Sequence, residues 1–217
     1  MLDTSVDKLV LKNKPYSSSE EWLNTASHAS GFIAAILGLI FLLMRVDNLF
    51  AQVVCFVYCL SMMMMFLSST LYHGVSNPIL KAKLKTLDHS AIYVLIAGTY
   101  TPFMLLVVGG TLGLVAISLI WIIALFGVAF KCFFEHRFPK LSLLTYLLMG
   151  WLALGFIYPL YQQLTSNGFW LLVAGGFCYT VGVAFYVAKS TRYTHAVWHL
   201  FVVAGCVCHY FSIYQNV

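Results

Sequence analysis

The stretch LGLVAISLIWIIALFGVAF, residues 112–130, decides the fold because it contains nineteen residues and no charge. An apolar helix of roughly 17–25 residues is long enough to cross the hydrocarbon layer of a bilayer. The rest of the chain has the same character, since hydrophobic residues make up 61% of its 217 residues and charged residues only 9%. Soluble domains contain about 25% charged residues. There is too little polar surface here to coat a globular domain, and we predict an integral membrane protein.

Six further apolar stretches surround this one, so the predicted fold is all-α, a bundle of seven transmembrane helices. The predicted spans are residues 25–44, 49–72, 87–108, 112–130, 141–160, 169–188 and 194–214. Isolated strands would leave backbone groups unpaired in lipid, and a β-barrel would show alternating segments of about ten residues. Pro102 is expected to kink the third span. Residues 1–20 carry mixed charge and no apolar core, so we predict a flexible cytoplasmic tail before a membrane domain over residues 21–217.

The basic residues predict the orientation of the bundle. In this topology eleven of the twelve Lys and Arg residues lie on one side of the membrane, and only Arg45 lies on the other. The positive-inside rule then places the N-terminus in the cytoplasm and the C-terminus outside. The same loops account for the net charge of +5 without a nucleic-acid partner. The eleven residues are Lys8, Lys12, Lys14, Lys81, Lys83, Lys85, Lys131, Arg137, Lys140, Lys189 and Arg192.

Polar residues from distant parts of the chain fall at one membrane depth. The cytoplasmic ends of the spans carry His73, Asp88, His195 and His199, and the start of the first span adds a further polar group. Ionisable side chains inside a membrane are costly and usually functional. We therefore predict a site in the cytoplasmic leaflet. The additional group on the first span consists of Glu21, Asn24 and His28, whose spacing of three and four places them on one helix face.

Helix geometry indicates a metal site. His195 and His199 are four residues apart and share one helix face, and so do Ser69 and His73. Three imidazoles are a recurrent set of catalytic zinc ligands that leaves the fourth position open. Another divalent metal remains an alternative, although three imidazoles suit zinc well. Asp88 is the only acid in the middle five spans, and it could hold and deprotonate a water molecule.

Two less specific interpretations apply to the same residues. A lone histidine near a membrane interface is usually a hydrogen-bonded anchor, and a pair four residues apart at a helix end can be structural. A metal held between three spans could also only tie the bundle together. The presence of both histidine features and an acid at one depth favours a functional site.

Four motifs carry a resemblance to a known family. EEWLNTASH, SSTLYH, LDHSAIYVLIAGTYTPF and HAVWH occur in this order from Glu20 onward. They resemble the hemolysin III proteins, the bacterial branch of the progestin and adipoQ receptor family. The resemblance implies seven transmembrane helices, a cytoplasmic N-terminus, the bacterial plasma (inner) membrane and a zinc ion near the cytoplasmic face. Its implied residues are zinc ligands at His73, His195 and His199, Asp88 binding the zinc water, Ser69 beside it, and supporting roles for Glu21, Asn24 and His28.

The family also resembles the alkaline ceramidases, in which a similar arrangement of three His, Asp and Ser cleaves a lipid amide. The resemblance thus implies membrane lipids as partners, a lipid amide as substrate, and a role in membrane lipid homeostasis. The alternatives are a non-enzymatic, zinc-stabilised membrane sensor or receptor and a pore-forming hemolysin. A pore needs a polar stripe over the full depth of a span, whereas the polar residues here stop in the inner half.

Overall fold

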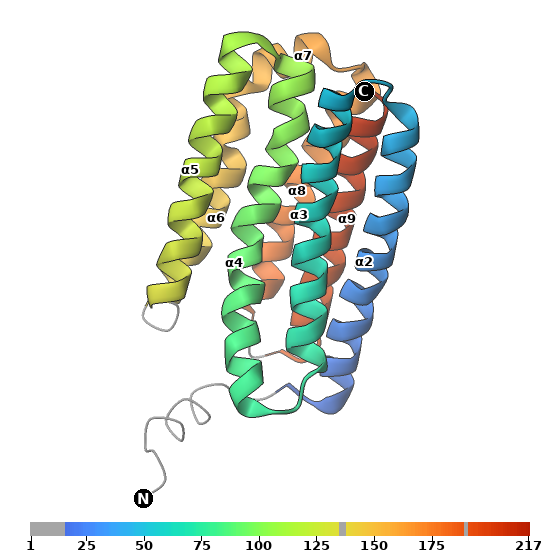
Figure 1. Ribbon diagram of the computed structural model, residues 1–217. Coiled ribbons are helices and arrows are strands. Elements are labelled where there is room, and N and C mark those ends of the chain that lie inside the picture. Colours follow the sequence, from blue (N-terminus) through green and yellow to red (C-terminus); the bar gives the residue numbers. More distant parts are fainter. Residues whose placement is uncertain (1–15, 135–137, 189–190) are drawn as a thin grey trace, which may run out of the picture.

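The computed structural model describes residues 16–134, 138–188 and 191–217, and these residues form an upright bundle of helices (Figure 1). Within them, seven helical segments are long and apolar enough to cross a membrane. The predicted all-α, seven-helix fold is confirmed. α2 begins at one end of the bundle, and the C-terminus lies at the other. The segments are Ser18–Arg45, Leu49–Gly74, Pro78–Val108, Gly110–Phe134, Lys140–Gln163, Ser166–Val187 and Thr194–Tyr214.

Five of the seven segments are single α-helices throughout, and the other two are divided into elements of different helix type. The elements in chain order are α2 (Ser18–Arg45), α3 (Leu49–Gly74), α4 (Pro78–Pro102), η1 (Phe103–Val108), α5 (Gly110–Phe134), α6 (Pro139–Trp151), η2 (Leu152–Phe156), α7 (Ile157–Gln163), α8 (Ser166–Val187) and α9 (Thr194–Tyr214).

Capping side chains set where the helices begin, and α2 and α4 start well before the predicted spans, at Ser18 and Pro78 instead of residues 25 and 87. Ser17 caps α2 by accepting a hydrogen bond from the Glu20 backbone N–H, while the Glu20 side chain accepts from the Ser17 N–H. Asn77 caps α4 by accepting from two backbone N–H groups, and Pro78 occupies the first turn. Residues 18–20 of the predicted tail therefore belong to α2. Residues 1–15 lie outside the described part of the chain.

The third span changes its helix type at Pro102, where the sequence predicted a kink. Proline has no N–H, so the carbonyl four residues earlier loses its usual donor. The chain continues as the π-helix η1 and ends at Gly109 and Gly110, whose φ angles are 65° and 59°. Such positive φ values favour glycine. Because a π-helix has more residues per turn than an α-helix, the span is wider at this end. Phe103 and Met104 of η1 are buried.

α3 lies inside the bundle and therefore brings its last turn to a shielded position. Half of its most apolar window is buried, compared with 11% for α8. Figure 1 shows α2, α3 and α9 together on one side, with α5 and α6 on the other. The end of α3 thus meets the starts of α2 and α9 at the N-terminal end of the bundle. His73 lies in this last turn of α3.

Candidate metal centre

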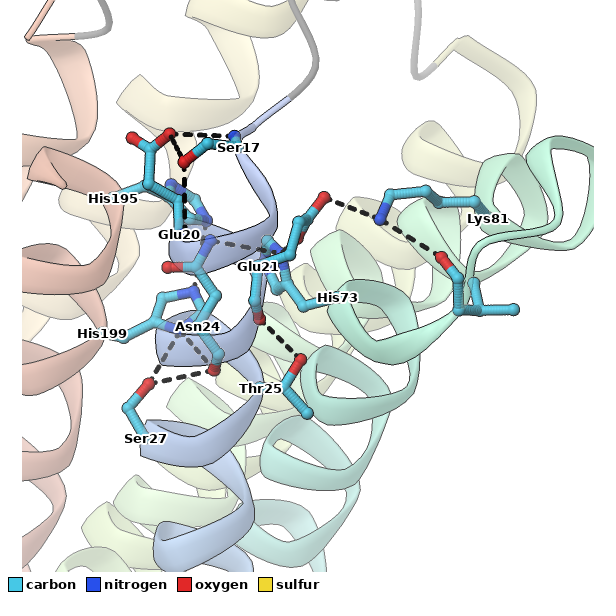
Figure 2. Close-up of polar contacts among 11 residues, drawn as sticks. Ser17, Glu20, Glu21, Asn24, Thr25, Ser27, His73, Lys81, His195 and His199 are labelled. Atoms are coloured by element: carbon cyan, nitrogen blue, oxygen red, sulfur yellow. Dashed lines mark hydrogen bonds and ion pairs between the residues drawn. The ribbon is translucent and has the colours of Figure 1, made fainter. Parts of the chain in front are cut away.

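Three histidines meet at the N-terminal end of the bundle. His73 comes from the end of α3, and His195 and His199 come from the first turns of α9. One ring nitrogen from each lies within 4.8 Å of the others, and the two Nε2 atoms of His195 and His199 are 3.1 Å apart. His73 and His199 are buried. The predicted convergence of the three rings is confirmed, and Figure 2 shows them beside the first turns of α2.

The ring of His73 is oriented by a carboxylate. Its Nδ1 lies 2.6 Å from Glu21 Oε2, and Lys81 Nζ donates to the other carboxylate oxygen at 2.7 Å (Figure 2). Asn24 Nδ2 lies 3.4 Å from the same Nδ1. A carboxylate at this distance favours the tautomer with the proton on Nδ1, which leaves a lone pair on Nε2. His73 Nε2 is buried and has no hydrogen-bond partner within the described residues.

The ring of His199 is oriented by a backbone carbonyl, which also contacts Nδ1. Its Nδ1 lies 3.1 Å from the carbonyl oxygen of Asn24 and 3.3 Å from Ser27 Oγ. A proton on Nδ1 donates to this carbonyl and leaves the lone pair of Nε2 directed at His195. One residue of α2, Asn24, therefore contacts the Nδ1 atoms of both His73 and His199.

The three residues fit a divalent metal ion. Histidine ligands of metals usually donate their second ring N–H to a carboxylate or a carbonyl, as His73 and His199 do here. Tetrahedral zinc with Zn–N bonds of about 2.0–2.1 Å places ligand nitrogens roughly 3.3 Å apart. The 3.1 Å between His195 and His199 matches that spacing. A cation between the rings would also satisfy the unpartnered Nε2 of His73. These observations support a metal site without identifying the metal.

His28 contacts the group from α2 without joining it. Its ring stacks on that of His199, with 3.6 Å between the ring centroids and 8° between the planes. Both of its nitrogens are buried and lack a partner in the described part of the chain. Glu21, Asn24 and His28 therefore all touch the ring of His73 or His199. Their functional roles stay predictions.

An apolar cavity of about 290 Å³ extends from the histidines into the bundle. Asp88, predicted to bind the zinc water, and Ser69, predicted to lie beside it, line this cavity together with His195 and His199. Leu160 of α7 and Leu172 near the start of α8 line it toward the opposite end of the bundle. Its size is at the lower end of the range for small-molecule sites. The cavity thus runs from the polar groups at one end along a mostly apolar wall, with His209 near the other end.

Three contacts at the centre were missed by sequence reasoning. Lys81 was assigned to a basic loop, Ser27 was not singled out, and Tyr16 was placed in the tail. Tyr16 packs its ring on that of His195, with 5.0 Å between centroids and 27° between planes. Burial raises the pKa of the Tyr16 phenol well above its ordinary value of 10, and nearby Tyr186 adds to this effect, so the phenol is protonated at neutral pH. The short polar stretch around Tyr16 contains no pattern that predicts its contact with His195.

The fold and the centre together define a class: a multi-pass, seven-helix membrane protein with a three-histidine group at one end of its bundle. The comparisons with known proteins give the particular family.

A family model described as Haemolysin-III related matches residues 16–210. Hemolysin-3 of Bacillus cereus is 44% identical over 197 residues, which are 89% of this chain and 90% of that protein. The Hemolysin-3 homolog of Bacillus subtilis (strain 168) is 42% identical over 201 residues, covering 91% and 94% of the two chains. The chain belongs to the haemolysin-III related family. The human monocyte to macrophage differentiation factor is more distant, at 28% identity over 204 residues, with 90% and 84% covered, and extends the match to the wider family that the motifs predicted.

Proposed function

We propose that this protein is a zinc-dependent hydrolase that cleaves a lipid amide within the bacterial plasma membrane and so contributes to membrane lipid homeostasis. One observation carries the proposal. Two members of the three-histidine group, His195 and His199, line an apolar cavity whose wall also contains Asp88 and Ser69. Metal ligands, a carboxylate and a hydroxyl can together supply a Lewis acid, a general base and a hydrogen-bond donor for amide hydrolysis, and an apolar channel suits an acyl chain.

His73, His195 and His199 would hold the ion. A bound zinc ion would polarise the amide carbonyl and lower the pKa of water to about 7. Glu21 and the Asn24 carbonyl fix the ring orientations of His73 and His199, so the ligand nitrogens are arranged before the substrate arrives.

Asp88 acts as the general base and then as the general acid. It accepts one proton from the attacking water, whose oxygen bonds to the carbonyl carbon. The same proton then passes to the nitrogen as the C–N bond breaks, so the products are a fatty acid and an amine. Ser69 donates a hydrogen bond to the carbonyl oxygen while negative charge develops there. The apolar walls of the cavity hold the acyl chain and keep bulk water away from the reaction.

The test uses purified protein in lipid nanodiscs, loaded with zinc and incubated with an N-acylated long-chain amine. Released fatty acid is measured by mass spectrometry. We expect Asp88→Asn to lower the rate by about 100-fold or more, because loss of general acid–base catalysis typically costs that much. Asp47→Asn is the matched control, since Asp47 is an exposed acid in the connection between α2 and α3, at the other end of the bundle.

Equal rates for Asp88→Asn and the unsubstituted protein would contradict the proposed mechanism. Zinc binding without any product from a range of lipid amides would instead favour the zinc-stabilised sensor.

A further inference from the structure

The segment Tyr16–Glu20, here named the N-terminal strap, reaches from the start of α2 to the start of α9. Glu20 makes the connection. Its Oε2 accepts from the Ser17 backbone N–H at 2.9 Å, and its Oε1 accepts from the Tyr193 backbone N–H at 2.9 Å. Ser19 Oγ and Tyr193 Oη are a further 3.3 Å pair. The Glu20 carboxylate therefore links Ser17, the neighbour of Tyr16, to Tyr193, which lies two residues before His195.

Tyr193 adopts an unusual backbone conformation where the strap contacts the start of α9. Tyr193 precedes the first turn of α9 with φ 64°, in the left-handed region that non-glycine residues seldom adopt. The hydrogen bond from its N–H to Glu20 helps to hold this conformation. This hydrogen bond therefore ties the strap to the chain two residues before His195.

Tyr16 lies directly on the metal centre. Its ring stacks on His195 at 5.0 Å, and it lies 5.8 Å from the ring of His73 at an interplanar angle of 55°. Tyr186 of α8 approaches His195 as well, with centroids 6.0 Å apart. The imidazole of His195 is thus flanked by two phenol rings. His73 and His199 are held through Nδ1 by oxygen atoms of α2.

We infer that Tyr16 positions His195 for metal binding and covers the centre on the side where the chain enters the bundle, so that the strap slows exchange of the metal. The inference rests on the metal site of the proposed function but not on hydrolysis. The contact is made by the ring face, so a phenylalanine would replace it and an alanine would not. Loss of Glu20 would act in the same direction, because the strap would no longer be tied to Tyr193.

The test measures zinc release from the zinc-loaded, full-length protein into a chromophoric chelator. We expect Tyr16→Ala to release zinc about 10-fold faster and to bind it more weakly, because residues that orient metal ligands typically contribute 10- to 100-fold to affinity. Glu20→Ala should shift both quantities in the same direction. Tyr16→Phe is the matched control and should keep the affinity and release rate of the unsubstituted protein.

A second readout does not depend on metal. In the zinc-free protein, diethyl pyrocarbonate should modify His195 several-fold faster in Tyr16→Ala than in Tyr16→Phe, as measured by peptide mass spectrometry. Equal modification and equal zinc release in the two variants would overturn the inference, and so would a Tyr16→Phe variant as impaired as Tyr16→Ala. If the unsubstituted protein binds no zinc, the metal site itself fails, whereas a site that binds zinc and ignores Tyr16→Ala refutes only the role of Tyr16.

Discussion

At the scale of single residues, the rings of His73 and His199 are oriented by the Glu21 carboxylate and the Asn24 carbonyl, which contact their Nδ1 atoms. His73 Nε2 is buried and unpartnered among the described residues, and such a group costs about 1–3 kcal/mol if it stays unsatisfied. The ring keeps this orientation because Glu21 binds its other nitrogen at 2.6 Å. The cost is offset when a cation occupies the space between the three rings. Glu21 therefore matters through its effect on His73.

We predict that Glu21→Gln weakens zinc binding by about 10-fold. An uncharged amide is a poorer acceptor for the His73 N–H, and it removes the charge that pairs with Lys81. The dissociation constant is measured by competition with a chelator of known affinity. Asp47→Asn removes an acid from the opposite end of the bundle and should leave the constant unchanged. A Glu21→Gln variant with the affinity of the unsubstituted protein would refute this role.

Residue patterns predicted much of the candidate site. The four-residue spacing of His195 and His199 and the depth of His73 were sufficient to predict that the rings meet, because helix periodicity and membrane depth are both readable from sequence. Tyr16 was not predictable in this way. Its contact depends on the Glu20 carboxylate binding the backbone of Tyr193, 173 residues later, and no periodicity encodes such a bond.

At the scale of elements, the widened helix η1 depends on a close contact with α5. A Cβ added to Gly113 of α5 would overlap the carbonyl oxygen of Met104 in η1. Backbone cannot yield as the end of a flexible side chain can, so α5 and η1 approach each other only because residue 113 has no side chain. This contact holds the end of the third span in place beside the cavity.

We predict that Gly113→Ala destabilises the protein by about 1–3 kcal/mol, as overpacking typically does. The matched control is Gly150→Ala in α6, where an added Cβ meets nothing within 4 Å. That substitution should be neutral or stabilising by up to about 1 kcal/mol, because alanine favours helix more than glycine does. Apparent unfolding temperatures in detergent measure the difference. Equal shifts for the two variants would contradict the contact.

Hydropathy predicted the elements better than their ends. It marks where the chain meets lipid, and so it placed the apolar part of every span. The helix starts at Ser18 and Pro78 depend instead on the capping side chains Ser17 and Asn77, which lie in polar sequence. Pro102 indicated an irregularity, but proline chemistry alone did not distinguish a kink from the π-helix that forms.

At the scale of the whole molecule, the bundle gathers its polar chemistry at one end. α3 and α9 carry the three histidines, and α2 carries the Glu21 carboxylate and the Asn24 carbonyl that orient His73 and His199. A metal at this point would join two helices that are far apart in the sequence. Because it would bind the folded state and not the unfolded chain, it would stabilise the bundle by about 2.7 kcal/mol at a metal concentration 100 times the dissociation constant.

The most direct measurement of the central claim is the metal content and thermal stability of the purified protein, compared with His199→Ala. We predict about one equivalent of zinc per chain, a lower unfolding temperature after chelation, and loss of both properties in the variant. His209→Ala is the control, since this buried histidine lies near the other end of the cavity, and it should retain zinc. A protein without bound metal, or a His199→Ala variant with the full metal content, would contradict the account.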